Sequence, residues 1–100
     1  MDTVDKVVKV NQLLDIYGRL LTKSQREIME DYYNFNLSLG EISKERNISR
    51  TAVQDSLKKS TKKLDDFEKK LGLCGVFDHL RNKDNAHLID EILEEIKNGI

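Results

Sequence analysis

Residues 37–64 read LSLGEISKERNISRTAVQDSLKKSTKKL, and this stretch decides the fold because it predicts two helices joined by a tight turn. Ser38 and Glu41 form an S-x-x-E capping box, in which each side chain can accept a hydrogen bond from the other residue's backbone N–H. We therefore expect a short helix over residues 39–46, with Leu39 and Ile42 facing inward.

The turn itself is predicted at Asn47-Ile48-Ser49. Asparagine tolerates the left-handed backbone conformation that ends a helix, and serine is a strong cap for the start of the next one. We expect Asn47 to reverse the chain, Ile48 to fill the corner with its side chain, and Ser49 to cap the helix that follows.

That following helix, expected over about residues 50–71, divides its residues between two faces. At 100° per residue its apolar residues fall on one narrow arc, bordered by small residues that let other helices approach. A helix–turn–helix needs this division, because its second helix is held along its back while its front enters a major groove. The apolar arc consists of Val53, Leu57, Leu64, Phe67 and Leu71, bordered by Ala52, Ser56 and Ser60.

Composition agrees with an all-α fold. The chain has 100 residues, of which 35 % are charged and 38 % hydrophobic, with no proline. We expect a single compact domain over residues 1–100, built of about six helices, with the helix–turn–helix at about 38–64 and extra helices before and after it. No apolar run approaches the roughly 20 residues that cross a bilayer, and no signal peptide opens the sequence. The lone Cys74 excludes an internal disulfide and suits a reducing cytoplasm, where we place the protein.

Charge is distributed unevenly, although the net charge is only −1. Residues 44–63 carry seven positive charges against two negative ones, a local charge of +5, whereas residues 78–100 carry six acids against three bases. A basic centre beside an acidic tail indicates one surface that faces a polyanion.

The N-terminal third predicts two helices. The first spans about residues 5–17, and its apolar seam, which steps by three and four, suits packing on another helix of this chain or of a second copy. Gly18 is expected to end or interrupt it, because glycine is the residue that most easily turns left-handed. Thr22 and Gln25 form a second capping box. We expect the tyrosines of the second helix in the core and not as a platform for base stacking. The seam is Val7, Val10, Leu14, Tyr17 and Leu21, and the inward residues of the second helix are Ile28, Met29, Tyr32 and Tyr33.

Beyond the long helix, Gly72 is the predicted stop and residues 73–75 are a predicted link to a short helix. Asp84 or Asn85 is expected to cap the last helix. Its apolar stripe is too strong to stay exposed, so it should pack on the first helix, the long helix or a partner copy. The stripe consists of Leu88, Ile89, Ile92, Leu93 and Ile96.

Three stretches carry a resemblance to a known family. Residues 21–28 (LTKSQREI, followed by the tyrosine pair at 32–33), 37–42 (LSLGEI) and 48–53 (ISRTAV) resemble the promoter-reading fourth region of bacterial sigma factors. With the first helix and residues 70–73 (KLGL), the pattern is similar to the YlxM family of small helix–turn–helix proteins, over most of the chain. That resemblance implies DNA binding and a link, through gene neighbourhood, with the signal recognition particle.

Candidate contacts follow from the front of the long helix, onto which the sigma-like reading helix maps. Gln54 can pair with adenine through two hydrogen bonds, and Thr51 can touch a thymine methyl group or a phosphate. The cations are suited to phosphates, which position a protein without specifying sequence, whereas Asp55 adds a negative charge beside them. The candidate nucleic-acid-binding residues are Arg50, Thr51, Gln54, Asp55, Lys58, Lys59 and Lys62.

Other chemistry has little support in the sequence. Cys74, His79 and His87 lie on different segments and do not make up the four ligands of a closed zinc site. The sequence contains no nucleophile motif and no glycine-rich phosphate loop. We therefore expect no metal, no cofactor and no enzymatic activity.

Two hypotheses of function remain. The favoured one is a DNA-binding regulator that acts as a homodimer, because one reading helix covers few base pairs and either apolar seam offers a symmetric interface. The alternative is an adaptor that uses the same scaffold to bind signal recognition particle RNA or protein, since a basic helix can lie along RNA phosphates without reading bases.

Overall fold

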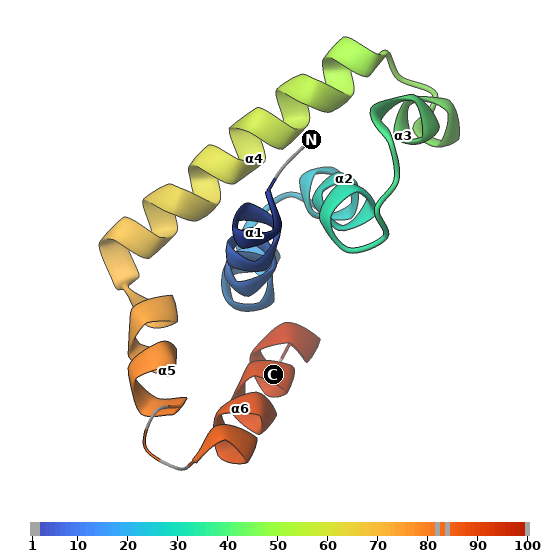
Figure 1. Ribbon diagram of the computed structural model, residues 1–100. Helices are drawn as coiled ribbons and strands as arrows, with labels where there is room; N and C mark the ends of the chain where they lie inside the picture. Colours follow the sequence, from blue (N-terminus) through green and yellow to red (C-terminus); the bar gives the residue numbers. More distant parts are fainter. Residues whose placement is uncertain (1–2, 82, 84, 100) are drawn as a thin grey trace.

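The computed structural model describes residues 3–81, 83 and 85–99. Within them the chain forms six α-helices, one 3₁₀ turn and no β-strand, so the predicted all-α fold of about six helices is confirmed (Figure 1). The helices are α1 (Val4–Tyr17), α2 (Lys23–Tyr33), α3 (Leu39–Arg46), α4 (Arg50–Leu71), α5 (Leu73–Arg81) and α6 (Ala86–Asn98), and the 3₁₀ turn is η1 (Gly18–Leu20).

Helix α1 is the centre of the fold. It packs against α2 and α4 and also contacts α5 and α6 (Figure 1). Val10, Leu14, Tyr17 and Leu21 of the predicted seam are buried, and Val7 is half-buried against the same core. The seam is therefore occupied within this chain, which leaves it unavailable to a second copy.

The end of α1 differs from the prediction. Gly18 follows the last residue of α1, so the predicted end of the helix is confirmed, but its φ of −55° continues right-handed into η1, and the expected left-handed conformation is wrong. Gly18 is buried, and a Cβ there would lie 3.8 Å from a methyl carbon of Leu14 and 3.9 Å from the Arg26 side chain. The backbone stays right-handed because the chain tightens into a 3₁₀ turn before it reaches α2.

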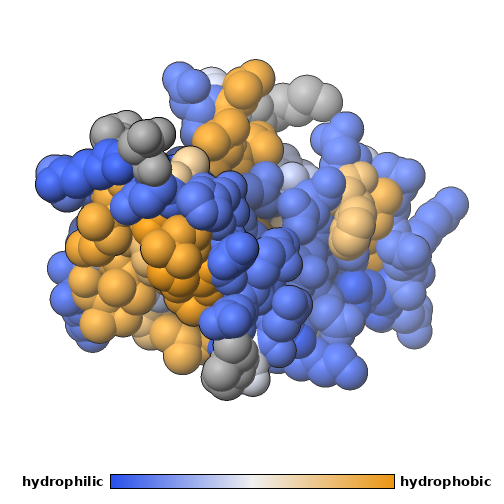
Figure 2. All heavy atoms as spheres, turned by 90° about the horizontal axis from the view of Figure 1, so that it is seen from below, coloured by the Kyte–Doolittle hydropathy of each residue, from blue (hydrophilic) through white to orange (hydrophobic). Residues whose placement is uncertain are grey.

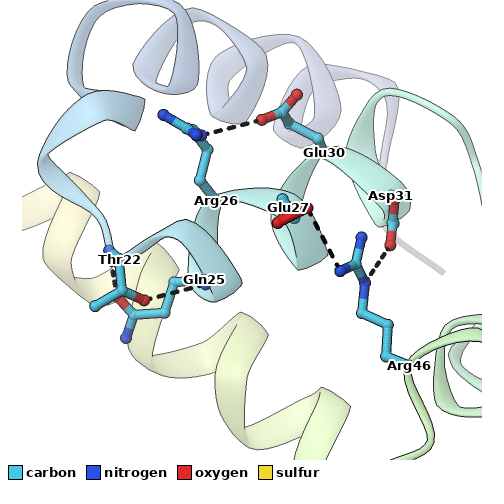
Figure 3. Close-up of polar contacts among 7 residues, drawn as sticks. All are labelled: Thr22, Gln25, Arg26, Glu27, Glu30, Asp31 and Arg46. Carbon is cyan, nitrogen blue, oxygen red and sulfur yellow. Dashed lines mark hydrogen bonds and ion pairs between the residues drawn. The ribbon is translucent and has the colours of Figure 1, made fainter.

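Helix α2 begins as its sequence predicts. The Thr22 hydroxyl accepts the Gln25 N–H at 3.2 Å, and the Gln25 side-chain oxygen accepts the Thr22 N–H at 3.2 Å, which completes the capping box (Figure 3). The predicted inward residues pack in the core, one of them less deeply than the others. Ile28, Met29 and Tyr33 are buried, and Tyr32 is half-buried.

The junction of α4 and α5 contains no linker. Gly72 ends α4 with φ +64°, as expected, but α5 starts at the next residue, so the predicted link over 73–75 is wrong. The Glu68 carboxylate accepts the N–H groups of Cys74 at 3.0 Å and Gly75 at 3.3 Å. These are two of the backbone donors that a helix start leaves without an intrahelical partner, so Glu68 supports the abrupt start of α5.

Tyr17 ties this junction to the core. Its hydroxyl donates to Glu68 Oε1 at 2.6 Å and accepts the Leu73 N–H at 3.1 Å. Only 1 % of the Tyr17 surface is exposed. Leu71, by contrast, is 55 % exposed, so its predicted place on the buried arc is wrong, because the last turn of α4 extends past α1 (Figure 1).

These contacts predict how stability depends on pH, beginning at the acidic end. Burial alone would raise the pKa of Glu68, but hydrogen bonds from the Tyr17 hydroxyl and from the N–H groups of Cys74 and Gly75 hold it below the ordinary value of 4.5. The ionised Glu68 therefore stabilises the fold fully at pH values above its ordinary pKa, and this stabilisation is lost as the pH falls through the lowered pKa of the folded state. Tyr17→Phe should reduce this acid-dependent loss in urea denaturation.

Tyr17 sets the alkaline limit. Burial, and then the hydrogen bond to the Glu68 carboxylate, raise its pKa from 10.0 to about 12. A group whose pKa is raised in the folded state contributes stability below its unfolded pKa and loses it as the pH rises through the folded value. The urea concentration at the midpoint of unfolding should therefore fall as the pH rises from about 10 to about 12 in the wild type. In Tyr17→Phe it should fall less steeply. Equal slopes in the two proteins would contradict this role of Tyr17.

Helix α6 packs against α1 and α5, with Ile89 buried and Leu93 and Ile96 half-buried. The predicted packing of the stripe on the first helix is therefore confirmed along one edge. On the other edge Leu88 stays 48 % and Ile92 37 % exposed, although the stripe was expected not to stay exposed. Hydrophobic side chains accordingly gather over α5 and α6 on the face seen from below (Figure 2).

The start of α6 differs from the prediction at Asn85. Asn85 precedes the helix without a side-chain capping bond, and the alternative cap, Asp84, lies outside the described residues. The first turn is instead held by backbone bonds from the N–H groups of Leu88 and Ile89 to the Asn85 carbonyl.

Candidate nucleic-acid interface

The turn between α3 and α4 follows the sequence closely. Ser38 and Glu41 form the capping box of α3, with hydrogen bonds of 2.9 and 3.1 Å. Asn47 is left-handed, with φ 55° and ψ 45°, and the Ser49 hydroxyl accepts the Ala52 N–H at 3.0 Å. The predicted roles of Ser38, Glu41, Asn47 and Ser49 are therefore confirmed.

Ile48 does not fill the corner of the turn. Its side chain is 36 % exposed, so this prediction is wrong. The corner is closed by polar contacts instead: the Ile48 N–H donates to the Ser43 carbonyl, and the Ser43 hydroxyl donates to the Ile48 carbonyl. Because these contacts satisfy the backbone, the turn does not need an apolar plug.

Helix α3 is fastened to α2 by an ion-pair cluster. Arg46 Nε lies 2.8 Å from Asp31 Oδ2, and Arg46 Nη1 lies 3.7 Å from Glu27 Oε2 (Figure 3). The Asp31 side chain is only 11 % exposed, so its charge needs this partner. The hydrogen bond to Asp31 raises the pKa of Arg46, because it favours the charged guanidinium. Arg46 is therefore a structural cation that is engaged by α2.

The back of α4 is held by the core. Four residues on one arc are buried, so the helix packs against the core along this arc for about three turns. They are Val53, Leu57, Ser60 and Leu64. Of the three small residues predicted to border the buried arc, Ser60 is buried and Ser56 is half-buried, whereas Ala52 is exposed, so the prediction is wrong for Ala52. This burial fixes the rotation of α4 about its axis, and with it the direction of the opposite face.

The front of α4 faces solvent. The seven residues predicted to bind nucleic acid all lie between positions 50 and 62 of this one helix, and all of them are exposed. The structure therefore leaves the whole predicted set accessible to a partner. The set is Arg50, Thr51, Gln54, Asp55, Lys58, Lys59 and Lys62.

The charges on this front differ in their availability. Lys59 Nζ lies 2.9 Å from Asp55 Oδ2, and Lys62 Nζ lies 3.3 Å from Asp66 Oδ2, each pair one turn apart. Exposed pairs of this kind contribute only about 0.2–1 kcal/mol, so a phosphate can displace the carboxylate. Lys58 has no ion-pair partner among the described residues. Asp55 is thus paired with its neighbour on the helix, which weakens its repulsion of a phosphate.

Arg50 lies against the start of α3. A Cβ built on Gly40 would lie 2.9 Å from Arg50 Nη2 and 3.3 Å from the guanidinium carbon. The missing side chain of Gly40 therefore makes the space in which the guanidinium rests. Sequence reasoning missed this contact, because the turn between the two helices decides how close these residues come.

Replacing Gly40 with alanine should stabilise the protein while moving Arg50. Alanine favours a helix over glycine by up to about 1 kcal/mol, and the colliding atoms are the far end of a flexible side chain. We expect a small rise in melting temperature together with a severalfold loss of affinity for DNA, because Arg50 leaves its position beside α3.

Gly75→Ala is the matched control for this change. Gly75 lies near the start of α5, and a Cβ there meets nothing within 4 Å. Thermal melts followed by circular dichroism should show a similar rise in melting temperature for Gly75→Ala, and its affinity for DNA should not change. A fall in stability for Gly40→Ala alone would mean that Arg50 cannot move aside.

A groove beside the front of α4 also escaped sequence reasoning. It has a volume of about 450 Å³ and lies between α4, the start of α1 and the end of α2. Its lining includes Lys6 and Tyr32 as well as Gln54, Lys58 and Lys62 of the predicted interface. No sequence motif announces it, because its residues come from helices that are distant in the sequence.

Metal and thiol chemistry find little support in the part of the chain that the structure describes. No three His, Cys, Asp or Glu side chains there are arranged to hold a metal ion. Cys74 is buried, and burial raises the pKa of its thiol to about 11, so it stays protonated at neutral pH. No helix of the described part is both long and apolar enough to cross a membrane.

The capped α3, the left-handed turn and the half-buried α4 together define a helix–turn–helix protein. Residues 4–99 match the family described as "Putative helix-turn-helix protein, YlxM / p13 like", and the chain belongs to this family. This confirms the resemblance to YlxM proteins. The family is described by its helix–turn–helix and not by an enzymatic activity.

Relatives in several bacteria are similar over most of the chain. A UPF0122 protein of Acetivibrio thermocellus is 48 % identical over 94 % of this chain and 76 % of its own length. One from Malacoplasma penetrans is 43 % identical over 86 % of this chain and 84 % of its own. One from Halalkalibacterium halodurans is 37 % identical over 97 % of this chain and 81 % of its own.

Proposed function

We propose that this protein binds duplex DNA by placing the front of α4 in the major groove. The observation that carries the proposal is the division of α4, because every predicted contact residue is exposed while Val53, Leu57 and Leu64 hold its back. In a helix–turn–helix, the N-terminal turns of the second helix meet the base edges. Those turns hold the candidate residues from Arg50 onward.

Each side chain has a role suited to its chemistry. Gln54 can read adenine through its amide, and Thr51 can contact a thymine methyl group or a phosphate. The cations on the helix front grip phosphates, which set the register of the protein on the duplex. Asp55 holds Lys59 at 2.9 Å until a phosphate displaces it. The cations are Arg50, Lys58, Lys59 and Lys62.

The biological role included in this proposal is regulation of transcription in the cytoplasm by a single-domain binding protein that is not an enzyme. The rival is an adaptor that binds signal recognition particle RNA or protein. Both use the same exposed cationic surface, so the choice of partner separates them.

The test compares three partners at one salt concentration by fluorescence anisotropy. They are a pool of random duplex DNA, the signal recognition particle RNA, and the protein subunit of that particle. We expect the DNA to bind at least about tenfold more tightly than either other partner, a difference of about 1.4 kcal/mol. Tighter binding to the RNA or protein would overturn the proposal in favour of the adaptor.

A homodimer is part of this proposal, and its interface would be the exposed surface of α5 and α6. The α1 seam is buried, whereas Val76, Leu88 and Ile92 remain exposed on these two helices. Glu91 and Glu95 follow Leu88 and Ile92 at helical spacing and lie on the same side of α6. Salt screens repulsion between acids, so we expect dimerisation to strengthen as salt rises, which is opposite to DNA binding.

The Leu88→Glu/Ile92→Glu variant should therefore be monomeric in size-exclusion chromatography with light scattering. Phe35→Glu is the matched control, since Phe35 is also exposed but lies between α2 and α3, away from α5 and α6. A wild-type chain that stays monomeric at high concentration and high salt would refute the dimer.

A further inference from the structure

The groove beside α4 has an aromatic floor. Tyr32 and Tyr33 line it together with Leu39 and Leu57, and the two tyrosine rings meet edge to face at 4.9 Å between centroids. Tyr33 is buried and supports Tyr32, which is only half-buried. A second hollow of about 330 Å³, towards the start of α3, is also lined by Tyr32. The Tyr32 side chain is therefore bordered by open space on two sides.

The walls of the groove are cationic. Four lysines face two aspartates, Asp65 and Asp66, so the lining carries a net charge of +2. One of those aspartates is already occupied, because Asp66 pairs with Lys62. Lys58 and Lys69 have no ion-pair partner among the described residues. The four lysines are Lys6, Lys58, Lys62 and Lys69.

The groove also offers groups that hydrogen-bond a planar ring. The Gln54 amide can donate and accept, and the Thr61 hydroxyl has a long contact of 3.9 Å to the sulfur of Met29. The volume of about 450 Å³ is within the roughly 300–1,000 Å³ of small-ligand sites. This combination of an aromatic floor, an amide, a hydroxyl group and lysines suits a nucleobase that carries a phosphate.

We propose that this groove takes one unpaired nucleotide, its base against Tyr32 and its phosphate on Lys58. A base inside an intact duplex cannot reach Tyr32, because both of its faces are stacked on neighbouring base pairs. An extrahelical or single-stranded base has a free face that an aromatic side chain can cover. This inference rests on the proposed function, since Gln54, Lys58 and Lys62 belong to both surfaces.

The experiment uses three probes: a blunt duplex, the same duplex with one bulged adenine, and free adenosine monophosphate. Affinity is measured by anisotropy or by competition. Binding at the groove is read from tyrosine fluorescence, because the chain has three tyrosines and no tryptophan. We expect the bulged duplex to bind about tenfold more tightly than the blunt one, which is about 1.4 kcal/mol, and to quench part of the tyrosine emission.

Two variants at Tyr32 separate stacking from folding. Tyr32→Phe keeps the ring, so it should keep the preference for the bulge while losing most of the quenching, because Tyr17 and Tyr33 are buried. Tyr32→Leu removes the ring and should abolish both, while its affinity for the blunt duplex stays close to that of the wild type. Thermal melts of both variants check that the fold is intact.

The outcomes are distinct. Equal affinity of the wild type for blunt and bulged duplexes, without quenching by any probe, would overturn the groove and leave DNA binding in place. Failure to bind the blunt duplex would overturn the proposed function, whereas Tyr32-dependent binding of the bulge would still support the groove. Tyr32-dependent binding of adenosine monophosphate alone would support the site and assign it to a free nucleotide. A preference for the bulge that survives in Tyr32→Leu would overturn the site.

Discussion

The double variant Lys58→Glu/Lys59→Glu should bind duplex DNA at least about a hundredfold more weakly than the wild type at low salt. Both side chains are exposed on the front of α4. Phosphate contacts supply essentially all of the non-specific binding energy through release of counterions, and this change replaces two attractive charges with two repulsive ones. The new acid at position 59 also lies one turn from Asp55, which then loses the cation that pairs with it.

The salt dependence gives a second readout of the same variant. If the four cations on the front of α4 each neutralise a phosphate, log affinity of the wild type should fall with log salt at a slope of about −3.6. The slope of the double variant should be much smaller. Anisotropy with a labelled duplex across a salt series measures both quantities.

Lys23→Glu/Lys70→Glu is the matched control, because it changes the net charge equally at exposed positions outside the predicted contact set. This control variant should lose far less affinity for duplex DNA than the test variant. A loss as large as that of the test variant would mean that net charge, and not the front of α4, governs binding. A flat salt response of the wild type would contradict the proposal altogether.

Tyr17→Phe should lower the free energy of unfolding by about 2–4 kcal/mol, because the hydroxyl makes two hydrogen bonds at a buried site, one of them to a charged group. The change removes the donor to Glu68 and the acceptor of the Leu73 N–H. Glu68→Gln should cost a similar amount, since it removes the charge that holds the start of α5.

Urea denaturation of the two single variants and of the double variant measures these losses. They should add incompletely in the double variant, because both changes break the same contacts. Tyr32→Phe is the control, since Tyr32 is a half-buried tyrosine outside this junction. Fully additive losses, or an equal loss in the control, would mean that Tyr17 and Glu68 do not act as a pair.

Local sequence signals predicted the helix boundaries well. The two capping boxes, the left-handed Asn47 and the stop at Gly72 all work within a few residues of chain, so their chemistry can be seen without knowing the fold. Burial was harder to predict at the margins. Leu71 and Ile48 have the right periodicity and position, but they are exposed, because the core does not extend beneath them.

The sequence by itself determined the helices, the turn between α3 and α4, and which residues stand on the front of the long helix, because 3.6-residue periodicity and capping are local properties. Only the tertiary structure decided what those helices enclose. Three features join residues from different helices: the hydrogen bond from Tyr17 to Glu68, the contact of Arg50 with Gly40, and the groove at Tyr32. Such contacts depend on the angles and depths at which helices pack, which no single segment specifies.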